Sequence, residues 1–452
     1  MLGIYLFALA AAPSAAAANV GIVLFTLAFF WQGRSLCPLL TEPVVLLGLL
    51  FAAFVTIHSL FWYLHAPDSD YASMVLRSAG DWIKLLFFIP FAWWLSSRPQ
   101  EIGRILFIAA VGLALGFLHK INWPVLDQGF LHRQFTAYLQ PLAMGLYAGV
   151  AVLGLLTCRS PLLRRWRAGP RRWLAVFGYL TLVAVLVELL ILSYSRTAWL
   201  CFAAGLILLA LRYVFLSQRE HALRNWQMGL LAGLVLFSLL VVNLDDLRDR
   251  MNAEVPVIEQ IIEGQFSEDA RGSIAVRLHG WQFALESWQQ RPWFGWGAGT
   301  SHLLIPASGL PQLRVGNLWL AHFHNTYLEL LFQFGAVGTL LFLLLLIALV
   351  VGAIRSRRAT HLSSVRDGCA CLYPLLLVAG VCTAAWVLAD HRATNHDWRF
   401  FWMLLAGSAF ALHLSASARA VGTAHGAHSA TVAQRDSARP LPSDRVKARR
   451  AE

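Results

Sequence analysis

Apolar residues run in long stretches along this chain, separated by short polar connections. A bilayer core requires about 20 consecutive apolar residues per helix, and about twelve stretches approach that length. They cover residues 2–15, 18–31, 43–65, 81–97, 101–119, 136–157, 173–193, 196–216, 226–243, 325–353, 369–389 and 398–414. The pattern predicts an all-α integral membrane protein. The first two stretches are short and alanine-rich, and Pro13 interrupts them.

Composition supports the membrane assignment. Hydrophobic residues make up 58% of the 452 residues. Charged residues make up 13%, about half the share in a soluble globular protein. So few charges can neither cover a water-soluble enzyme nor solvate a disordered chain, which excludes both classes. The six cysteines lie in or beside apolar stretches without paired CxxC motifs, which indicates apolar packing rather than a disulfide framework or a metal site.

The net charge of +12 comes mainly from arginines, and many of them lie in the connections between the apolar stretches. With the N-terminus inside, the short cytoplasmic connections hold 16 arginines, and the opposite short connections hold five basic residues. Positive residues accumulate on the cytoplasmic side of membrane proteins, so both termini are expected to be cytoplasmic. The basic charge thus indicates orientation in the membrane and predicts no nucleic-acid partner.

One connection is much longer than the others. Transmembrane segments are expected over 1–243 and 322–414, a periplasmic loop over 244–321, and a disordered cytoplasmic tail over 415–452. Five apolar residues of the loop recur at helical spacing: Ile274, Leu278, Trp281, Leu285 and Trp288. They predict an amphipathic helix that ends before Pro292. Loops of this length exceed what a connection requires and are often functional.

Three polar features fall on the predicted outer side of the membrane. Arg196 lies in a tight turn between two spans, Arg277 lies on the loop helix, and His324 lies where the loop enters the next span. Each has a plain structural interpretation, because arginines at an interface snorkel and an interfacial histidine can bond a backbone carbonyl. Their placement on one side, from segments far apart in sequence, favours a common site.

Several short motifs occur in this chain in an order that resembles a known protein family. The motifs are Ser195-Arg196-Thr197, Arg277, Pro292 with Gly295-Trp296-Gly297, and His324-Asn325-Thr326-Tyr327-Leu328-Glu329 with Gly335 and Gly338. Together they resemble the O-antigen ligase and polymerase superfamily, the Wzy-C type of membrane glycosyltransferase. The resemblance is closest over about 192–338. It implies a GT-C-like fold of about 12 transmembrane helices, with one large periplasmic loop containing amphipathic helices.

The resemblance implies an O-antigen ligase of the bacterial inner membrane with its active site facing the periplasm. Such ligases transfer a glycan from undecaprenyl diphosphate to a sugar of the lipid A core. Matched residue by residue, Arg196 and Arg277 hold the diphosphate and His324 is the catalytic base. Asn325 belongs to the same motif, and His322 is an extra histidine beside it.

The chemistry of these side chains agrees with those roles. Guanidinium groups bind phosphate oxygens with paired hydrogen bonds and stay charged, and an imidazole can accept a proton from an attacking sugar hydroxyl. Two arginines already supply positive charge to the leaving group, so no metal and no cofactor is expected. Glu188, inside a predicted span, is expected to pair with and orient an arginine, and Lys84 could add positive charge near a lipid phosphate.

Three alternatives remain open from sequence. An O-antigen polymerase uses the same donor with a second lipid-linked glycan as acceptor. A protein O-oligosaccharyltransferase of the same superfamily usually carries more sequence after the HN motif than this chain has. A transporter is less favoured, because the chain has no obvious internal repeat and no matched pair of broken helices. In each case the surrounding membrane lipids are also partners.

Overall fold

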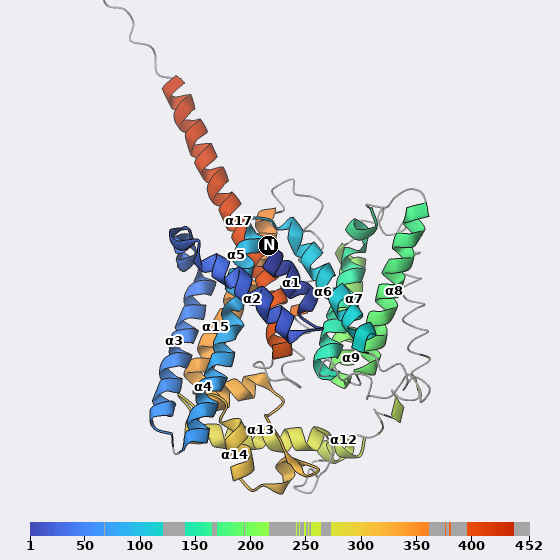
Figure 1. Cartoon of the computed structure of the whole chain (residues 1–452), viewed down its shortest axis with the longest axis vertical. Helices are drawn as coiled ribbons and strands as arrows, with labels where there is room; N and C mark the ends of the chain where they lie inside the picture. The colour runs from blue at the N-terminus through green and yellow to red at the C-terminus, as the bar shows by residue number, and fades with distance from the viewer. Residues whose placement is uncertain are drawn as a thin grey trace, which may run out of the picture.

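The computed structural model describes residues 1–66, 68–120, 141–164, 170–193, 195–216, 255–263, 273–360 and 396–437, with single residues between 241 and 252 and between 376 and 380. Within these ranges helices dominate, and the strands are two of two residues each. Figure 1 shows a bundle of long helices with shorter helices lying across one end. The expectation of an all-α membrane protein is confirmed at this level.

Nine helices, besides α1 (Leu2–Ala10) and α2 (Ala15–Phe30), form the described part of the bundle. They are α3 (Pro43–Leu64), α4 (Ser69–Ile83), α5 (Phe88–Ser96), α6 (Gln100–Lys120), α7 (Pro141–Arg164), α8 (Pro170–Leu192), α9 (Arg196–Leu216), α15 (Thr326–Thr360) and α17 (His396–Ser437). Five described stretches are long and apolar enough to cross a membrane: Pro43–Leu64, Gln100–His119, Arg172–Leu192, Thr326–Ser356 and Trp398–Ala418. Shorter apolar helices accompany them, as in a multi-pass protein. The predicted spans 226–243 and 369–389 lie almost entirely outside the described residues.

The prediction of a membrane span over residues 2–15 is wrong, because the helix ends at Ala10. The chain forms α1 (Leu2–Ala10), a turn, and α2 (Ala15–Phe30), which begins where the Ser14 hydroxyl accepts a hydrogen bond from the Ala17 N–H at 3.3 Å. At about 1.5 Å per residue, the 9 residues of α1 cover only about half of a hydrocarbon core. The two helices pack very closely, since a Cβ on Gly21 would lie 2.6 Å from the carbonyl oxygen of Gly3.

The predicted span over 81–97 is wrong at its start. Helix α4 already begins at Ser69, where the Asp68 carboxylate accepts the Tyr71 N–H at 2.7 Å. A 3-10 segment, η2 (Lys84–Phe87), then joins α4 to α5. The sequence pattern missed this start because charged residues interrupt the apolar face of α4.

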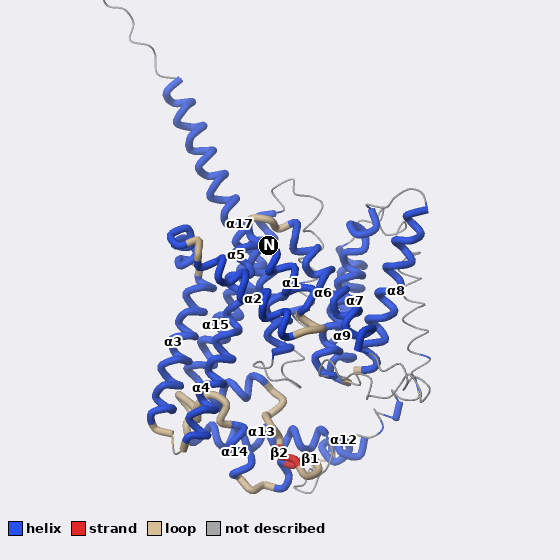
Figure 2. The backbone as a smooth tube through the Cα atoms, viewed as in Figure 1, coloured by secondary structure: helices blue, strands red, loops and turns tan. Residues whose placement is uncertain are grey.

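A layer of short elements, here called the loop layer, covers one end of the bundle (Figure 2). It contains α12 (Val255–Ile262), α13 (Ser273–Gln290), α14 (Ser301–Ala307), η5 (Pro311–Leu313), β1 (Arg314–Val315) and β2 (Leu318–Trp319). The strands pair antiparallel, and Gly316 turns between them at a φ of +61°. The layer has its own small core with the start of α15: Val276, Ala284, Ile305, Leu313, Leu320, Phe323 and Phe332.

The predicted amphipathic helix is confirmed as α13, which ends two residues before Pro292. Its buried face differs from the expected one, because Leu285 is 41% exposed while Ala284 is buried. Small residues form the face of α13 that packs against the segment containing Leu320. A Cβ on Gly280, for example, would lie 3.3 Å from Leu320. The large side chains therefore flank this contact instead of forming its centre.

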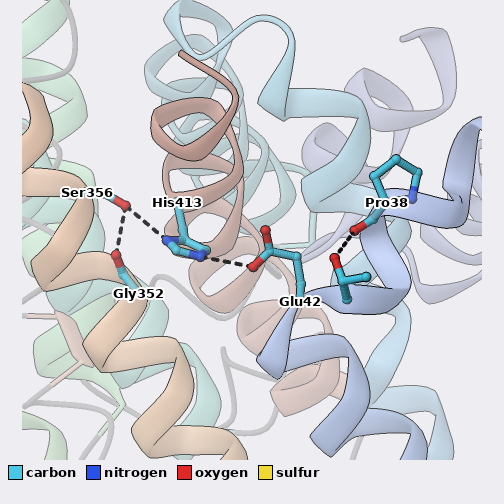
Figure 3. A network of polar contacts seen from close by, with 6 residues as sticks. Pro38, Glu42, Gly352, Ser356 and His413 are labelled. Atoms are coloured by element: carbon cyan, nitrogen blue, oxygen red, sulfur yellow. Dashed lines mark hydrogen bonds and ion pairs between the residues drawn. The ribbon is translucent and has the colours of Figure 1, made fainter. Parts of the chain in front are cut away.

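A cluster of polar contacts, here called the polar clasp, joins three helices near the C-terminal end of α15 (Figure 3). The His413 ring of α17 lies between Glu42, just before α3, and Ser356 near the end of α15. Its Nε2 is 3.2 Å from a Glu42 carboxylate oxygen, and its Nδ1 is 3.4 Å from the Ser356 hydroxyl. The Ser356 hydroxyl also donates to the Gly352 carbonyl at 2.7 Å. The clasp fixes the positions of α3, α15 and α17 relative to one another.

The tail expected over 415–452 is partly helical. Helix α17 continues through Ser415 to Ser437 and projects away from the bundle in Figure 1. Residues 415–437 are rich in alanine and contain no proline, so intrinsic helix propensity favours continuation of the helix. Residues 438–452 lie outside the described part of the chain.

Candidate active site

The HN motif forms the start of α15. The Asn325 side-chain oxygen accepts the N–H groups of Tyr327 at 3.0 Å and Leu328 at 3.2 Å, so Asn325 caps the helix. Asparagine is among the best residues at this position because its side chain satisfies N–H groups that the helix leaves open. Asn325 is itself buried. Asn325 therefore fixes the start of α15 immediately after His324.

His324 has an unusual backbone conformation. Its φ is +51°, and it is the one non-glycine residue with a positive φ in the described part of the chain. This conformation typically costs about 1–3 kcal/mol and persists where the surroundings enforce it, often at functional sites. The His324 N–H donates to Nδ1 of His322 at 3.1 Å, and the two ring centroids are 4.2 Å apart. Nδ1 of His322 therefore carries no proton, and a neutral His322 holds its proton on Nε2.

Helix α13 supports this segment from the loop layer. The Trp281 indole donates to the carbonyl oxygen of Phe323 at 2.9 Å. The Phe323 side chain is fully buried in the loop-layer core, with its ring centroid 5.0 Å from that of Phe332. Phe323 thus anchors the segment, while the two flanking histidines remain partly accessible.

Arg277 lies one helical turn before Trp281 on α13 and is partly accessible. Residues four apart on a helix share a face, with Cβ atoms about 5–6 Å apart. Because Trp281 contacts the Phe323 carbonyl, Arg277 is on the face of α13 that meets the histidine segment. These two sequence-predicted positions, Arg277 and His324, are therefore carried by elements in direct contact.

The turn before Arg196 is tightly packed. The Ser193 hydroxyl donates to the Leu190 carbonyl at 2.6 Å and accepts the Ser195 N–H at 3.2 Å. The Ser195 hydroxyl accepts the Ala198 N–H at 3.2 Å and caps α9, which begins at Arg196. Both serines are buried. Figure 1 shows that this α8–α9 turn lies at the same end of the bundle as α13. The Arg196 side chain lies outside the described residues, so its grouping with His324 stays a prediction.

The Pro292–Gly297 turn docks against a break in α15. Backbone N–H groups of Trp296 and Gly297 donate to the carbonyls of Phe332 and Gln333, each at 2.9 Å. In return, the Ala336 and Val337 N–H groups donate to the carbonyls of Pro292, at 2.8 Å, and Trp293, at 3.1 Å. These bonds replace helical bonds that are lost where α15 breaks at Gly335, whose φ is +62° and ψ is −163°. The tight turn expected from the glycine-rich motif is therefore present.

Replacing Gly335 with alanine is expected to destabilise the protein strongly. A Cβ there would lie 2.3 Å from the carbonyl carbon of Trp293, in addition to the roughly 1–2 kcal/mol that an L-residue pays for a left-handed φ. Gly309→Ala is the matched control, because Gly309 has a φ of +69° but no atom within 4 Å of that position. Thermal unfolding of the purified protein should show a larger loss for Gly335→Ala. Equal losses would mean that the turn does not pack against the break.

A buried polar network surrounds this break. The Gln333 side-chain oxygen accepts the Trp82 indole N–H and the Gly299 N–H, each at 3.0 Å. Its amide donates to the Glu329 carboxylate at 3.3 Å, and the Ser301 hydroxyl donates to the same carboxylate oxygen at 2.6 Å. Glu329 and Gln333 are 1% and 3% exposed, so this network is inaccessible to solvent. It joins α4, α14 and α15 to Gly299, which follows the Pro292–Gly297 turn (here called the glycine turn), close to the capped end of α15.

Glu329 stands in the motif without a predicted role, and Gln333 is a buried polar residue that was not predicted from the sequence. The sequence does contain a signal for this network. A carboxylate and an amide stand one helical turn apart at the start of an apolar span, and polar groups in a span need partners within the protein. The bonds to Trp82 and Ser301 join segments distant in sequence, so no local pattern predicts them.

An arginine outside the predicted set fixes the start of the glycine turn. The Arg291 guanidinium lies 4.5 Å from the ring centre of Trp62 and 4.1 Å from that of Trp296. The Tyr71 hydroxyl donates to the Trp296 carbonyl at 2.8 Å. Burial raises the pKa of Tyr71, while the nearby Arg291 lowers it, and the net shift is upward. Tyr71 therefore remains a hydrogen-bond donor at neutral pH.

The two other predicted support residues are placed as follows. Lys84 lies in η2, where its ammonium is 3.0 Å from the Asp81 carboxylate. Glu188 lies half-buried within α8, and among the described side chains no arginine contacts it. Its expected pairing with an arginine therefore stays a prediction. No cluster of three or more potential metal ligands occurs among the described residues.

Comparison with known proteins identifies the same region. Residues 180–343 match the model of the O-antigen ligase family, Wzy_C. The match begins within α8, contains the serine turn, α13, the glycine turn and the HN motif, and ends after the break in α15. A general O-oligosaccharyltransferase of Acinetobacter baylyi is 24% identical over 284 residues, which cover 58% of this chain and 45% of that relative. The chain thus spans less than half the length of that relative. The comparisons confirm the resemblance inferred from the motifs: over residues 180–343, this chain matches the O-antigen ligase domain.

Proposed function

We propose that this protein is an O-antigen ligase. It transfers a glycan from undecaprenyl diphosphate to a sugar hydroxyl of the lipid A core, at the periplasmic face of the bacterial inner membrane. The observation that carries the proposal is that the family match over residues 180–343 covers the serine turn, α13 and the HN motif. The apolar helices around these elements suit a donor and an acceptor that are both lipids.

Arg277 and Arg196 bind the diphosphate in this proposal. When the anomeric carbon separates from the donor, negative charge grows on the departing diphosphate. Guanidinium groups present paired N–H donors that match phosphate oxygens and remain charged at any physiological pH. Fixed positive charge directed at a developing anion is often the largest contribution to catalysis. Arg277 is partly accessible and lies on α13, which contacts the histidine segment through Trp281, and this supports the role.

His324 acts as the general base. The acceptor hydroxyl oxygen forms a bond to the anomeric carbon while the bond from that carbon to the diphosphate oxygen breaks. The hydroxyl proton moves to the His324 imidazole, and undecaprenyl diphosphate leaves with the bonding electron pair. A neutral imidazole has one ring nitrogen without a proton, and this nitrogen can accept the proton of the hydroxyl. His322 positions His324 through the bond to its backbone N–H.

A second candidate is transfer of the glycan to a protein hydroxyl. The similarity to a general O-oligosaccharyltransferase favours it. The same donor site and base would serve, because a serine hydroxyl and a sugar hydroxyl present the same nucleophile. The two candidates therefore differ in the acceptor alone.

Deletion of the gene distinguishes these functions. Under the ligase proposal, lipopolysaccharide loses all long glycan and the polymer accumulates on the lipid carrier. A single repeat unit still attached to lipid A would instead indicate a polymerase. Unchanged lipopolysaccharide with loss of protein glycosylation would indicate the O-oligosaccharyltransferase, and unchanged glycans with altered solute uptake would indicate a transporter.

Glycan transfer by the purified protein is expected to persist in excess EDTA and without any nucleotide. Many enzymes that act on diphosphates use a divalent ion to neutralise the leaving group. Here two arginines supply that charge, and the lipid diphosphate is already an activated donor. Initial rates with EDTA and with added Mg²⁺ or Mn²⁺ should agree. A rate that falls with EDTA and returns with either ion would contradict the proposal.

A further inference from the structure

A groove with a cavity of about 370 Å³ lies between α2, η2 and the first turns of α17. Its walls are mainly apolar and include Val23 and Leu27 of α2 and Met403 of α17. Val23 and Leu27 are 54% and 65% exposed. Exposed apolar side chains on a membrane protein face hydrocarbon, so the groove is accessible from the lipid. Its lining includes Lys84, which the sequence suggested as a support residue, but none of Arg196, Arg277 and His324.

Two cations lie in this apolar groove. Lys84 and Arg399 both line it, and both bind the same Asp81 carboxylate oxygen. One negative and two positive charges leave the cluster with a net charge of +1. The Lys84 side chain is 50% exposed, and ammonium and guanidinium groups have several N–H donors, so one carboxylate oxygen does not exhaust them. Among the described side chains that line it, the groove therefore offers one unneutralised positive charge beside an apolar wall.

The charged cluster lies at the edge of the membrane. Arg399 is the second residue of the apolar span Trp398–Ala418, which places it at headgroup level. The Trp402 indole donates to the Leu85 carbonyl at 3.0 Å, so η2 and Lys84 share this level. In Figure 1, α17 starts at the end that faces the loop layer and leaves the bundle at the opposite end. By the arginine bias, this edge is the periplasmic leaflet.

We propose that this groove binds an anionic phospholipid with a single charge, such as phosphatidylglycerol. Its phosphodiester contacts Lys84 and Arg399, and one acyl chain lies along Val23, Leu27 and Met403. The single charge of a phosphodiester matches the net charge of the cluster, whereas a lipid diphosphate carries more negative charge than this cluster neutralises. This lipid is therefore distinct from the proposed donor.

The bound lipid would stabilise the buried polar network next to the candidate active site. Lys84 follows Trp82 by two residues, and the Trp82 indole holds Gln333 in the network next to Glu329. A lipid that bridges η2 and α17 would restrain this part of α4. This lipid is a structural component of the protein, and its binding does not depend on which acceptor the enzyme uses.

Thermal unfolding of the full-length protein in detergent tests this proposal. Phosphatidylglycerol is expected to raise the Tm by several degrees, whereas zwitterionic phosphatidylcholine should leave it unchanged, because binding to the folded state alone stabilises it. Lys84→Gln should abolish the shift. Arg104→Gln is the matched control, because Arg104 also pairs with an acidic residue three positions earlier, Glu101, but does not line the groove. An equal shift in Lys84→Gln would overturn the proposal.

A second variant tests the apolar part of the groove without changing a charge. Val23→Trp fills the groove from the lipid-exposed face of α2 and should also abolish the phosphatidylglycerol shift. Native mass spectrometry should detect one retained phosphatidylglycerol in the parent protein and none in Val23→Trp. Retention of the lipid in this variant would show that it binds elsewhere on the protein, and displacement of phosphatidylglycerol by undecaprenyl diphosphate would show that the groove has another occupant. Either result would overturn the proposal.

Discussion

Replacement of His324 with alanine is expected to abolish glycan transfer while the donor still binds. A general base typically contributes 10²–10⁴-fold, and it acts on the acceptor hydroxyl rather than on the diphosphate. The rate constant should therefore fall by about that factor, with little change in the affinity for undecaprenyl-diphosphate-linked glycan. Single-turnover rates and binding of labelled donor to the purified variant measure the two effects separately.

His322 provides the comparison for this experiment. Its Nδ1 accepts the His324 N–H at 3.1 Å, so it acts on the base through the backbone. Loss of one such bond is worth about 1 kcal/mol, so His322→Ala should lose roughly fivefold to tenfold in rate. His322→Asn should recover part of the loss, because its side-chain oxygen can accept the same N–H. Equal and complete loss in both alanine variants, with restoration by a divalent ion, would favour a shared metal instead.

Replacement of Arg277 with lysine is expected to lower transfer by about 10²–10³-fold, the cost of one donor lost from a charge-stabilising site. Lysine keeps the charge but cannot reproduce the paired N–H geometry of a guanidinium group. Transfer in membrane vesicles should be normalised to the amount of protein present, which is expected to be unchanged. Arg196→Lys should behave in the same way if both arginines hold the diphosphate.

Arg314→Lys is the matched control for this result. Arg314 is another arginine of the loop layer, where its guanidinium lies 4.1 Å from the Trp319 ring centre. It lies on the exposed hairpin, and its replacement should leave the rate near that of the parent protein. Near-normal transfer by Arg277→Lys would show that Arg277 is an interfacial anchor.

Local sequence patterns predicted the elements that depend on local chemistry. The spacing of Ile274, Leu278 and Trp281 indicated α13, and Pro292 indicated its end. The prediction of which face of α13 is buried was wrong. Hydrophobicity alone does not show that the small residues Gly280 and Ala284 let the helix pack most closely on the rest of the loop layer. The first helix was predicted to be too long, because apolar alanines continue from α1 into the turn that follows it.

The part of the site that sequence missed depends on contacts between distant segments. The break at Gly335 is stable because Pro292 and Trp293 supply backbone carbonyls to the N–H groups that follow it. Likewise, Gln333 is satisfied by Trp82 and Gly299, which no periodicity places beside it. The sequence placed Arg277 on the loop helix and His324 at the entrance to the next span, but only the Trp281–Phe323 bond shows that these two elements are in contact.

Reconstituted transfer tests the central claim most directly. Purified protein in proteoliposomes would receive undecaprenyl-diphosphate-linked glycan and lipid A core, with no other enzyme present. The ligase proposal predicts glycosylated lipid A core and free undecaprenyl diphosphate in equal amounts, and neither product from His324→Ala. Elongated glycan on undecaprenyl diphosphate with unmodified lipid A core, or no product from the parent protein, would contradict it.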